Sequence, residues 1–301
     1  MTRSQERTPD NNDNIAIETV LKTRIITALI LAPIAIGGIF FLPPLGFALF
    51  TGVIIAVGAW EWANMAGIER PLGRVGFALA VAAILIGLLE VPANIVLWAA
   101  LVWWLVGFVL VCVYPGGSDR WSSSTARAVM GLLVLVPAWV GLNHLRTGGF
   151  QFGGSASNLL LILYVFCIVW VADIGAYFSG RAFGKAKLAP RVSPGKSWAG
   201  VWGGLFAVAV FALLIGLWAS ASSRDIALLM LASLITGGIS VVGDLMESML
   251  KRFRGIKDSS HLLPGHGGIM DRIDSLTAAI PVFALIITQL GWLTAGALVI
   301  S

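Results

Sequence analysis

Charged residues are scarce in this chain of 301 residues. Asp, Glu, Lys and Arg make up 12% of it, about half the share that is usual in soluble globular domains. Cysteine is scarce too, and the only two, Cys112 and Cys167, lie within apolar runs, which excludes a disulfide scaffold. Because 58% of the residues are hydrophobic, intrinsic disorder and a nucleic-acid-binding domain are also excluded, despite the net charge of +5. This composition indicates a membrane protein.

Nine apolar runs approach the length of roughly 20 residues that a helix needs to cross a bilayer. They lack the alternation of barrel strands, so the sequence predicts an all-α polytopic membrane protein with about nine transmembrane helices. Eight or ten spans are the alternatives, because the runs near 75 and 128 are short. The runs lie near residues 24–42, 45–65, 75–91, 94–114, 128–145, 157–179, 199–219, 226–247 and 276–300.

The basic residues are distributed unevenly over the gaps between these runs. With a cytoplasmic N-terminus, 18 of the 20 Lys and Arg fall on the cytoplasmic side, and only Arg146 and Arg224 fall outside. The positive-inside rule therefore predicts a cytoplasmic N-terminus and a C-terminus on the opposite side. Residues 1–23 are expected to form a disordered cytoplasmic tail, 24–156 the N-terminal transmembrane helices, and 157–301 a catalytic region with cytoplasmic loops at 180–199 and 248–275.

A first polar block runs from Asp173 to Gly200. Asp173 and Tyr177 share one helix face, and the cations Lys185, Lys187, Arg191 and Lys196 follow. The stretch from Ser193 to Ser197 precedes an apolar helix, whose N-terminus suits a phosphate. A P-loop is excluded because its first glycine is replaced by Pro190. An ordinary positive-inside loop is the simpler alternative.

A second polar block runs from Asp244 to Asp274. Asp271 and Asp274 are three residues apart, so on a helix they face one way, and Asp244 or Glu247 is expected to meet them from the preceding helix. Carboxylates beside so many cations suit Mg²⁺ with a polyphosphate. Surface salt bridges are the alternative, but they leave the intramembrane position of Asp244 unexplained.

The second block resembles the signature of the phosphatidate cytidylyltransferase family, also called CDP-diacylglycerol synthases. That signature is S-x-x-K-R, four residues, K-D, an apolar stretch, H-G-G, two residues, and D-R-x-D. It is met without departure by Ser248, Lys251, Arg252, Lys257, Asp258, His266, Gly267, Gly268, Asp271, Arg272 and Asp274. Upstream family elements are matched by Asp173, Ala176, Tyr177, Gly180, Arg181, Gly184, Lys185, Ser193, Pro194, Lys196, Ser197 and Gly200. The N-terminal half matches only as generic hydrophobic helices.

The resemblance implies an enzyme of the bacterial inner membrane that condenses CTP with phosphatidic acid, releasing pyrophosphate and leaving CDP-diacylglycerol in the bilayer. Its active site would face the cytoplasm. We expect Mg²⁺, with or without a second cation, on Asp244, Asp271 and Asp274. The other expected catalytic residues are Lys251, Arg252, Lys257, Asp258, His266 and Arg272, and the expected substrate-binding residues are Asp173, Tyr177, Lys185, Ser193, Lys196, Ser197, Ser248, Gly267 and Gly268.

Several points stay open at the level of sequence. His266 is equally suited to carry a proton or to contact a phosphate or the base. A homodimer would suit a lipid enzyme with an entrance in the membrane. Glu61, inside an apolar run, is expected to pair with a polar group of another span. The rival hypotheses are an ion-coupled transporter, which the many neighbouring cations disfavour, a CDP-alcohol phosphotransferase, whose own motif is missing, and a structural membrane partner.

Overall fold

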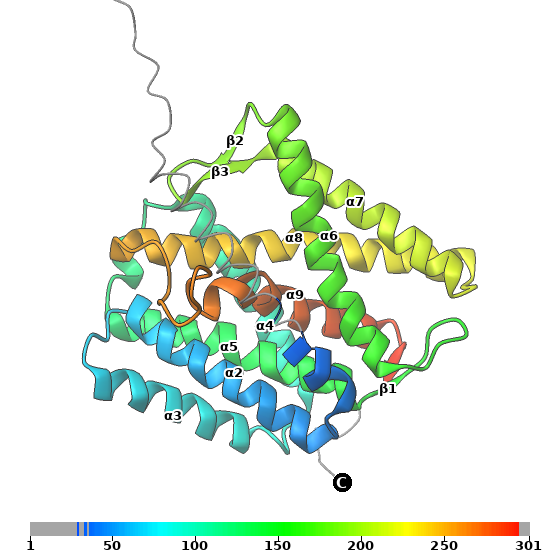
Figure 1. The fold of residues 1–301 in the computed structure, drawn as a ribbon, viewed down its shortest axis with the longest axis horizontal. Helices are drawn as coiled ribbons and strands as arrows, with labels where there is room; N and C mark the ends of the chain where they lie inside the picture. The colour runs from blue at the N-terminus through cyan, green and yellow to red at the C-terminus, as the bar shows by residue number, and fades with distance from the viewer. Residues whose placement is uncertain (1–28, 30–32, 35, 295–301) are drawn as a thin grey trace, which may run out of the picture.

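The computed structural model describes residues 29, 33, 34 and 36–294. The predicted tail and nine of the 19 residues of the first apolar run, 24–42, lie outside these residues, as do residues 295–301 at the end of the last run. Each of the eight later runs overlaps a helix, as Figure 1 shows, but the last run, 276–300, overlaps a helix that starts at Met270 and ends at Gln289. The helices are α2 (Pro44–Met65), α3 (Pro71–Gly87), α4 (Ala93–Val113), α5 (Ser124–Thr147), α6 (Asn158–Phe183), α7 (Trp198–Trp218), α8 (Ser223–Arg254) and α9 (Met270–Gln289).

Six of these helices, α2, α4, α5, α6, α7 and α8, are long and apolar enough to cross a membrane, and α3 is a shorter apolar helix. The chain is therefore a mostly helical, multi-pass membrane protein. The described part also contains a 3₁₀ turn (Ser118–Trp121) and two short antiparallel pairs: β1 (Gly149–Phe150) with β4 (Leu293–Thr294), and β2 (Lys187–Ala189) with β3 (Ser193–Ser197).

Helix α9 lies at the centre of the bundle. It packs against α4, α5, α6 and α8, and most of its residues from Ser275 to Ile287 are buried. Because the helix is enclosed by protein, its first turns are held in a fixed position beside α8. The outer helices instead expose large apolar side chains such as Leu79, Leu105 and Phe206, as expected of a surface that meets lipid.

Helices α6 and α7 pack closely through glycines. A Cβ at Gly204 would lie 2.7 Å from the carbonyl oxygen of Ala172, and one at Gly175 would lie 2.8 Å from that of Gly203. Small residues at a membrane helix interface allow this approach. The close packing brings the first polar block on α6 beside the start of α7.

Both predicted cytoplasmic loops are shorter than expected. The segment 180–199 begins as helix, because α6 continues to Phe183 and α7 starts at Trp198. The segment 248–275 loses both ends to helices: α8 continues to Arg254, where Gly255 ends it with a φ of 69°, and α9 starts at Met270. Polar composition suggested a loop, but no helix-breaking residue precedes Gly255 in this part of α8.

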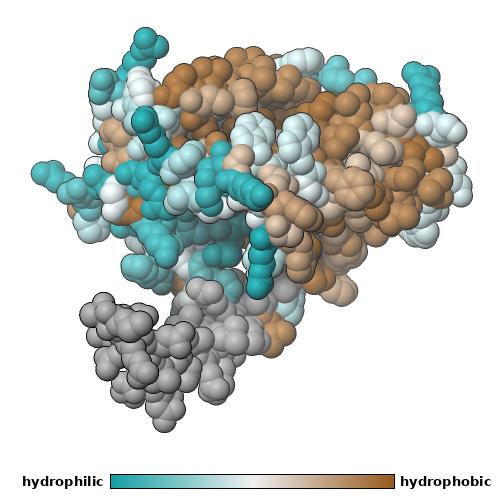
Figure 2. Space-filling model, turned by 90° about the horizontal axis from the view of Figure 1, so that it is seen from above, coloured by the Kyte–Doolittle hydropathy of each residue, from teal (hydrophilic) through white to brown (hydrophobic). Residues whose placement is uncertain are grey.

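Polar side chains gather toward one side of the molecule in the view of Figure 2, and apolar side chains cover most of the remaining surface that it shows. In the fold, α8 packs against both α9 and β3, and the polar end of α6 lies against β3, where Gly180 and Gly184 approach Ser197. Helix packing therefore brings the two polar blocks of the sequence together.

Candidate active site

Two neighbouring groups of residues make up the site. The first surrounds a cavity of about 420 Å³ between α6, α7, α8 and β3. Asp173 and Tyr177 line it from α6, and Lys196 and Ser197 line it from β3. Lys196 Nζ lies 2.5 Å from Asp244 Oδ2 on α8, so an ion pair ties the hairpin to that helix.

The polar residues around this cavity are held by local bonds. Ser248 Oγ donates to Asp244 Oδ1 over 3.2 Å, and Arg181 donates to the hydroxyl of Tyr177 over 3.2 Å. Ser197 is the N-cap of α7, where its Oγ accepts from the backbone N–H of Gly200. Since a hydroxyl both accepts and donates, this cap leaves the Ser197 hydrogen for a ligand in the cavity.

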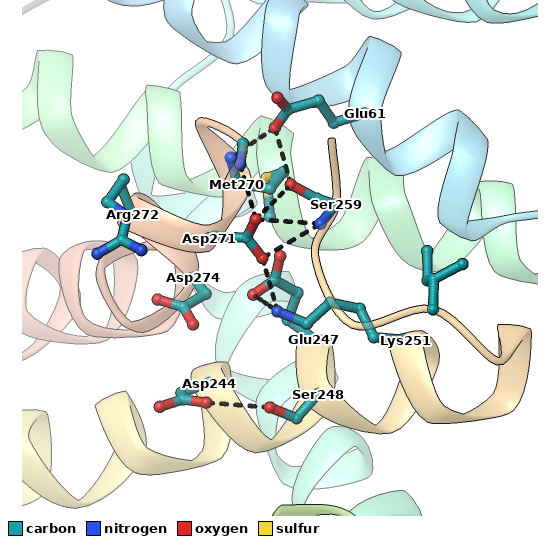
Figure 3. A network of polar contacts seen from close by, with 12 residues as sticks. Glu61, Asp244, Glu247, Ser248, Lys251, Ser259, Met270, Asp271, Arg272 and Asp274 are labelled. Atoms are coloured by element: carbon teal, nitrogen blue, oxygen red, sulfur yellow. Dashed lines mark hydrogen bonds and ion pairs between the residues drawn. The ribbon is translucent and has the colours of Figure 1, made fainter. Parts of the chain in front are cut away.

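The second group lies where α8 meets the start of α9 (Figure 3). Lys251 Nζ donates to Asp271 Oδ1 over 2.7 Å and to Glu247 Oε2 over 3.1 Å. Asp271 also accepts from the backbone N–H of Gly268 over 2.8 Å and from the N–H and Oγ of Ser259. These donors occupy the acceptor positions that a carboxylate has.

The first turns of α9, outside the six candidate spans, hold two carboxylates in opposite environments. Burial alone would raise the pKa of Asp271, but the hydrogen bonds from Lys251 and from the backbone of Gly268 and Ser259 bring it below its ordinary value. Burial and the nearby charge of Asp244 raise the pKa of Asp274 to about 7. The prediction that acids from α8 meet those of α9 is confirmed.

The predicted metal ligands do not form one cluster. Among the described residues, no group of three or more His, Cys, Asp or Glu side chains is placed to hold a metal ion. Asp244 and Asp274 are neighbours, whereas Asp271 points to Lys251 and Ser259 (Figure 3). The oxygen donors of Asp244 and Asp274 suit Mg²⁺, which commonly binds one or two carboxylates together with phosphates and water.

The glycines of the second block allow a close approach to these carboxylates. Gly267 has a φ of 81°, and a Cβ there would lie 2.5 Å from Asp271 Oδ2. A Cβ at Gly268 would overlap Ser259 Oγ and the carboxylate of Glu61. Both glycines therefore shape the turn before α9.

The structure places other predicted residues at the edge of the site. Arg252 donates to the carbonyl oxygen of Val192, which links α8 to the β2–β3 connection. Arg272 is exposed and donates twice to the carbonyl oxygen of His266, at 3.1 and 2.7 Å. The His266 Nδ1 atom is buried without a hydrogen-bond partner. Lys185 is exposed just before β2, and Ser193 is half-buried at the start of β3.

Lys257 and Asp258 are not brought to the Asp173–Lys196 cavity. They line a separate pocket of about 460 Å³ with Trp60, Arg74 and His261. Both residues are close in sequence to Lys251. Gly255 ends α8 between Lys251 and Lys257, however, and turns the chain toward α2. A residue pattern alone does not reveal that turn.

Sequence reasoning left Glu61, Ser259 and Ser260 out of the site, and it named Glu247 only as an acid that could meet the carboxylates of α9. Glu61 is fully buried and bonds to Ser259, Ser260 and the start of α9. Glu61 was expected to pair with a polar group of another span, whereas its partners are two serines of the turn before α9 and the first amides of that helix. A carboxylate inside an apolar run is costly in a membrane, so the position of Glu61 was the sequence feature that indicated a functional role.

Known proteins resemble the chain over most of its length. The cytidylyltransferase family matches residues 22–290. A Pseudomonas aeruginosa protein named phosphatidate cytidylyltransferase is 53% identical over 275 residues, which cover 91% of this chain and 99% of that protein. Proteins of the same name from Haemophilus influenzae and Staphylococcus epidermidis are 40% and 31% identical, over 88% and 89% of this chain and 98% and 97% of their own.

Proposed function

The chain belongs to the cytidylyltransferase family, and from this premise we propose that it condenses CTP with phosphatidic acid. A phosphatidate oxygen attacks the α-phosphorus of CTP, the bond from that phosphorus to the bridging oxygen breaks, and pyrophosphate leaves. CDP-diacylglycerol remains in the bilayer. The observation that carries the proposal is the pairing of Lys196 with Asp244 beside a cavity framed by membrane helices, because the reaction joins a water-soluble and a lipid phosphate.

The reaction requires alignment and charge neutralisation more than a strong base, since a phosphate monoester is already a nucleophile. We assign the reacting phosphates to the Asp173–Lys196 cavity. Lys196 would leave Asp244 for a phosphate, and Ser197 would donate its hydroxyl hydrogen at the start of α7. Lys251 and Arg252, on the same helix as Asp244, supply further positive charge, as does Arg272.

Mg²⁺ would be held by Asp244 and Asp274, where it would neutralise phosphate charge and orient the triphosphate. The oxygen donors of the two carboxylates support this assignment, as do the burial and the neighbouring charge of Asp244 that raise the pKa of Asp274. Asp271 would be a third ligand only if Lys251 left its Oδ1, as it would when drawn to a bound triphosphate. The need for a second cation and the homodimer remain predictions.

The proposed orientation puts the N-terminus and the site on the cytoplasmic side of a bacterial cell membrane, with nine spans and the C-terminus outside. The distribution of basic residues supports it: Arg146 lies at the end of α5 and Arg224 at the start of α8, whereas the site cations lie at the opposite helix ends. CTP is a cytosolic substrate, so a site on that face has direct access to it.

Pyrophosphate release tests the function. Purified protein in detergent receives CTP, Mg²⁺ and phosphatidic acid, with each omitted in turn and a chelator as control. We expect release only when all three are present. A folded, monodisperse protein that releases none would contradict the proposal, and flux assays in liposomes would then examine the transporter alternative.

A further inference from the structure

Glu61 is a buried carboxylate in the N-terminal half of the chain. It lies on α2 near its C-terminal end and has no exposed surface. Its Oε1 accepts from Ser260 Oγ at 2.6 Å and from the N–H of Ile269 at 3.0 Å, and its Oε2 accepts from the N–H of Met270 at 2.7 Å and from Ser259 Oγ at 3.2 Å. All four donors belong to the segment that carries the site into α9.

These bonds fix the start of α9. Ile269 occupies the N-cap position, and no side chain of its own segment caps the helix there. The carboxylate of Glu61 therefore accepts the N–H groups of residues 269 and 270, which a buried helix start would otherwise leave unpaired. Because a carboxylate also interacts favourably with the positive end of the helix dipole, Glu61 acts as a cap supplied by a distant helix.

The next residue along the chain is Asp271. Ser259 Oγ lies 3.2 Å from Glu61 Oε2 and 3.0 Å from Asp271 Oδ2, so its single hydroxyl hydrogen is shared between the two carboxylates (Figure 3). Asp271 in turn holds Lys251 at 2.7 Å. A continuous chain of hydrogen bonds thus runs from α2 through the turn to a cation on α8.

We propose that Glu61 is a positioning residue for cytidylyl transfer, which sets the place of Asp271 and Lys251 by anchoring the turn from Ser259 to Met270. It acts through Ser259 and the backbone and touches no substrate. The inference rests on the proposed function, and it assigns the otherwise generic N-terminal half a direct part in the geometry of the site.

Glu61→Gln is the main test. The amide keeps the size of the side chain but presents an NH₂ group to N–H donors, so the start of α9 shifts. Because misplacement by about 1 Å can lower a rate about 100-fold, we expect kcat to fall roughly 10- to 100-fold while KM for CTP changes less than about threefold. Hydrogen exchange should accelerate in residues 257–270 and not in the other helices.

Ser259→Ala provides the second arm. If Glu61 acts through Ser259, the double variant Glu61→Gln/Ser259→Ala should lose less activity than the product of the two single losses. A purely structural role would give fold-losses that multiply, which means additive changes in activation free energy, together with faster exchange throughout the bundle. Should Glu61→Gln not fold, Ser260→Ala removes the 2.6 Å bond to Glu61 together with the acceptor of the Leu262 N–H, and it should lower kcat about 3- to 10-fold with faster exchange in the same segment.

Glu69→Gln is the matched control. Glu69 follows the same helix, is exposed and pairs with Arg254 at 3.2 Å, so its loss should change kcat less than about twofold. The inference is overturned if Glu61→Gln keeps kcat within threefold of wild type, or if Ser260→Ala changes neither kcat nor exchange. Hydrogen exchange is measured without substrate, so it tests the anchoring by Glu61 independently of catalysis. Wild-type protein that releases no pyrophosphate would instead refute the proposed function.

Discussion

At the scale of single residues, Asp271 and Asp274 show how environment separates two identical side chains. Asp271 accepts hydrogen bonds from Lys251, Gly268 and Ser259, so its charge is compensated by the protein. Asp274 accepts from the N–H of Ser275 at 2.7 Å and lies beside Asp244. Asp271 therefore organises the site, and Asp274 is the carboxylate with charge available for a cation.

Replacement of Asp271 by Asn should nearly abolish turnover while membrane insertion persists. The amide loses the charge that holds Lys251, and its NH₂ group faces N–H donors. We expect pyrophosphate release to fall roughly 100-fold or more, the scale of losing a preorganised charge contact. Lys187→Ala is the control, because Lys187 is exposed on β2 and outside both motifs. Turnover near the wild-type level in Asp271→Asn would remove this residue from the catalytic arrangement.

Replacement of Asp274 by Asn should stabilise the protein above neutral pH while it impairs activity. The pKa of Asp274 is raised to about 7 from an unfolded value near 3.9. The folded state is therefore penalised fully above pH 7, where the buried carboxyl is charged, and not at all below about pH 4. The Asn oxygen still accepts from Ser275.

Thermal unfolding in detergent at pH 8 and pH 5 measures this effect. Each kcal/mol gained should raise the Tm by about 2–4 °C, so the variant should unfold at a higher temperature than wild type at pH 8, by a margin that narrows at pH 5. An equal or lower Tm at pH 8 would show that the charge of Asp274 is compensated in the folded protein.

At the scale of elements, the turn between α8 and α9 is shaped by close contacts. Gly255 ends α8 in the left-handed region, and Gly268 lies against Ser259 and Glu61. The turn is packed between α2 and α9 by the Glu61 bonds. The absence of a side chain at Gly267 and Gly268 therefore leaves the room that the carboxylates of Asp271 and Glu61 occupy.

Gly268→Ala tests this account. The added methyl would overlap Ser259 Oγ and the Glu61 carboxylate, so we expect at least a roughly 10-fold loss of turnover and a lower Tm, measured on purified protein. Gly238→Ala on α8 is the control, since a Cβ there meets nothing within 4 Å. That substitution should preserve activity and stabilise the helix by about 0.5–1 kcal/mol. Comparable losses in both variants would indicate a general intolerance to added methyl groups.

At the scale of the whole molecule, the sequence predicts the helical segments well and the site in part. Apolar length predicts the eight described helices, and motif spacing predicts that Asp244 meets Asp274. The diversion of Lys257 and Asp258 into another pocket depends on a backbone turn at Gly255. The capping by Glu61 depends on how α2 packs against α9. Neither follows from periodicity, because both are set by contacts between distant segments.

Membrane orientation is a property of the whole chain, and the uneven distribution of basic residues predicts it. In a background with Cys112 and Cys167 replaced by Ser, one new cysteine is placed at Lys187 on the β2–β3 hairpin and another at Ser223, the first residue of α8. Both positions are exposed. A membrane-impermeant maleimide should label Lys187→Cys only in inside-out vesicles and Ser223→Cys only in right-side-out vesicles. The reverse pattern would place the Lys196–Asp244 cavity away from CTP. Only α7 lies between the two positions, so labelling of both cysteines from the same face would show that α7 does not cross the membrane.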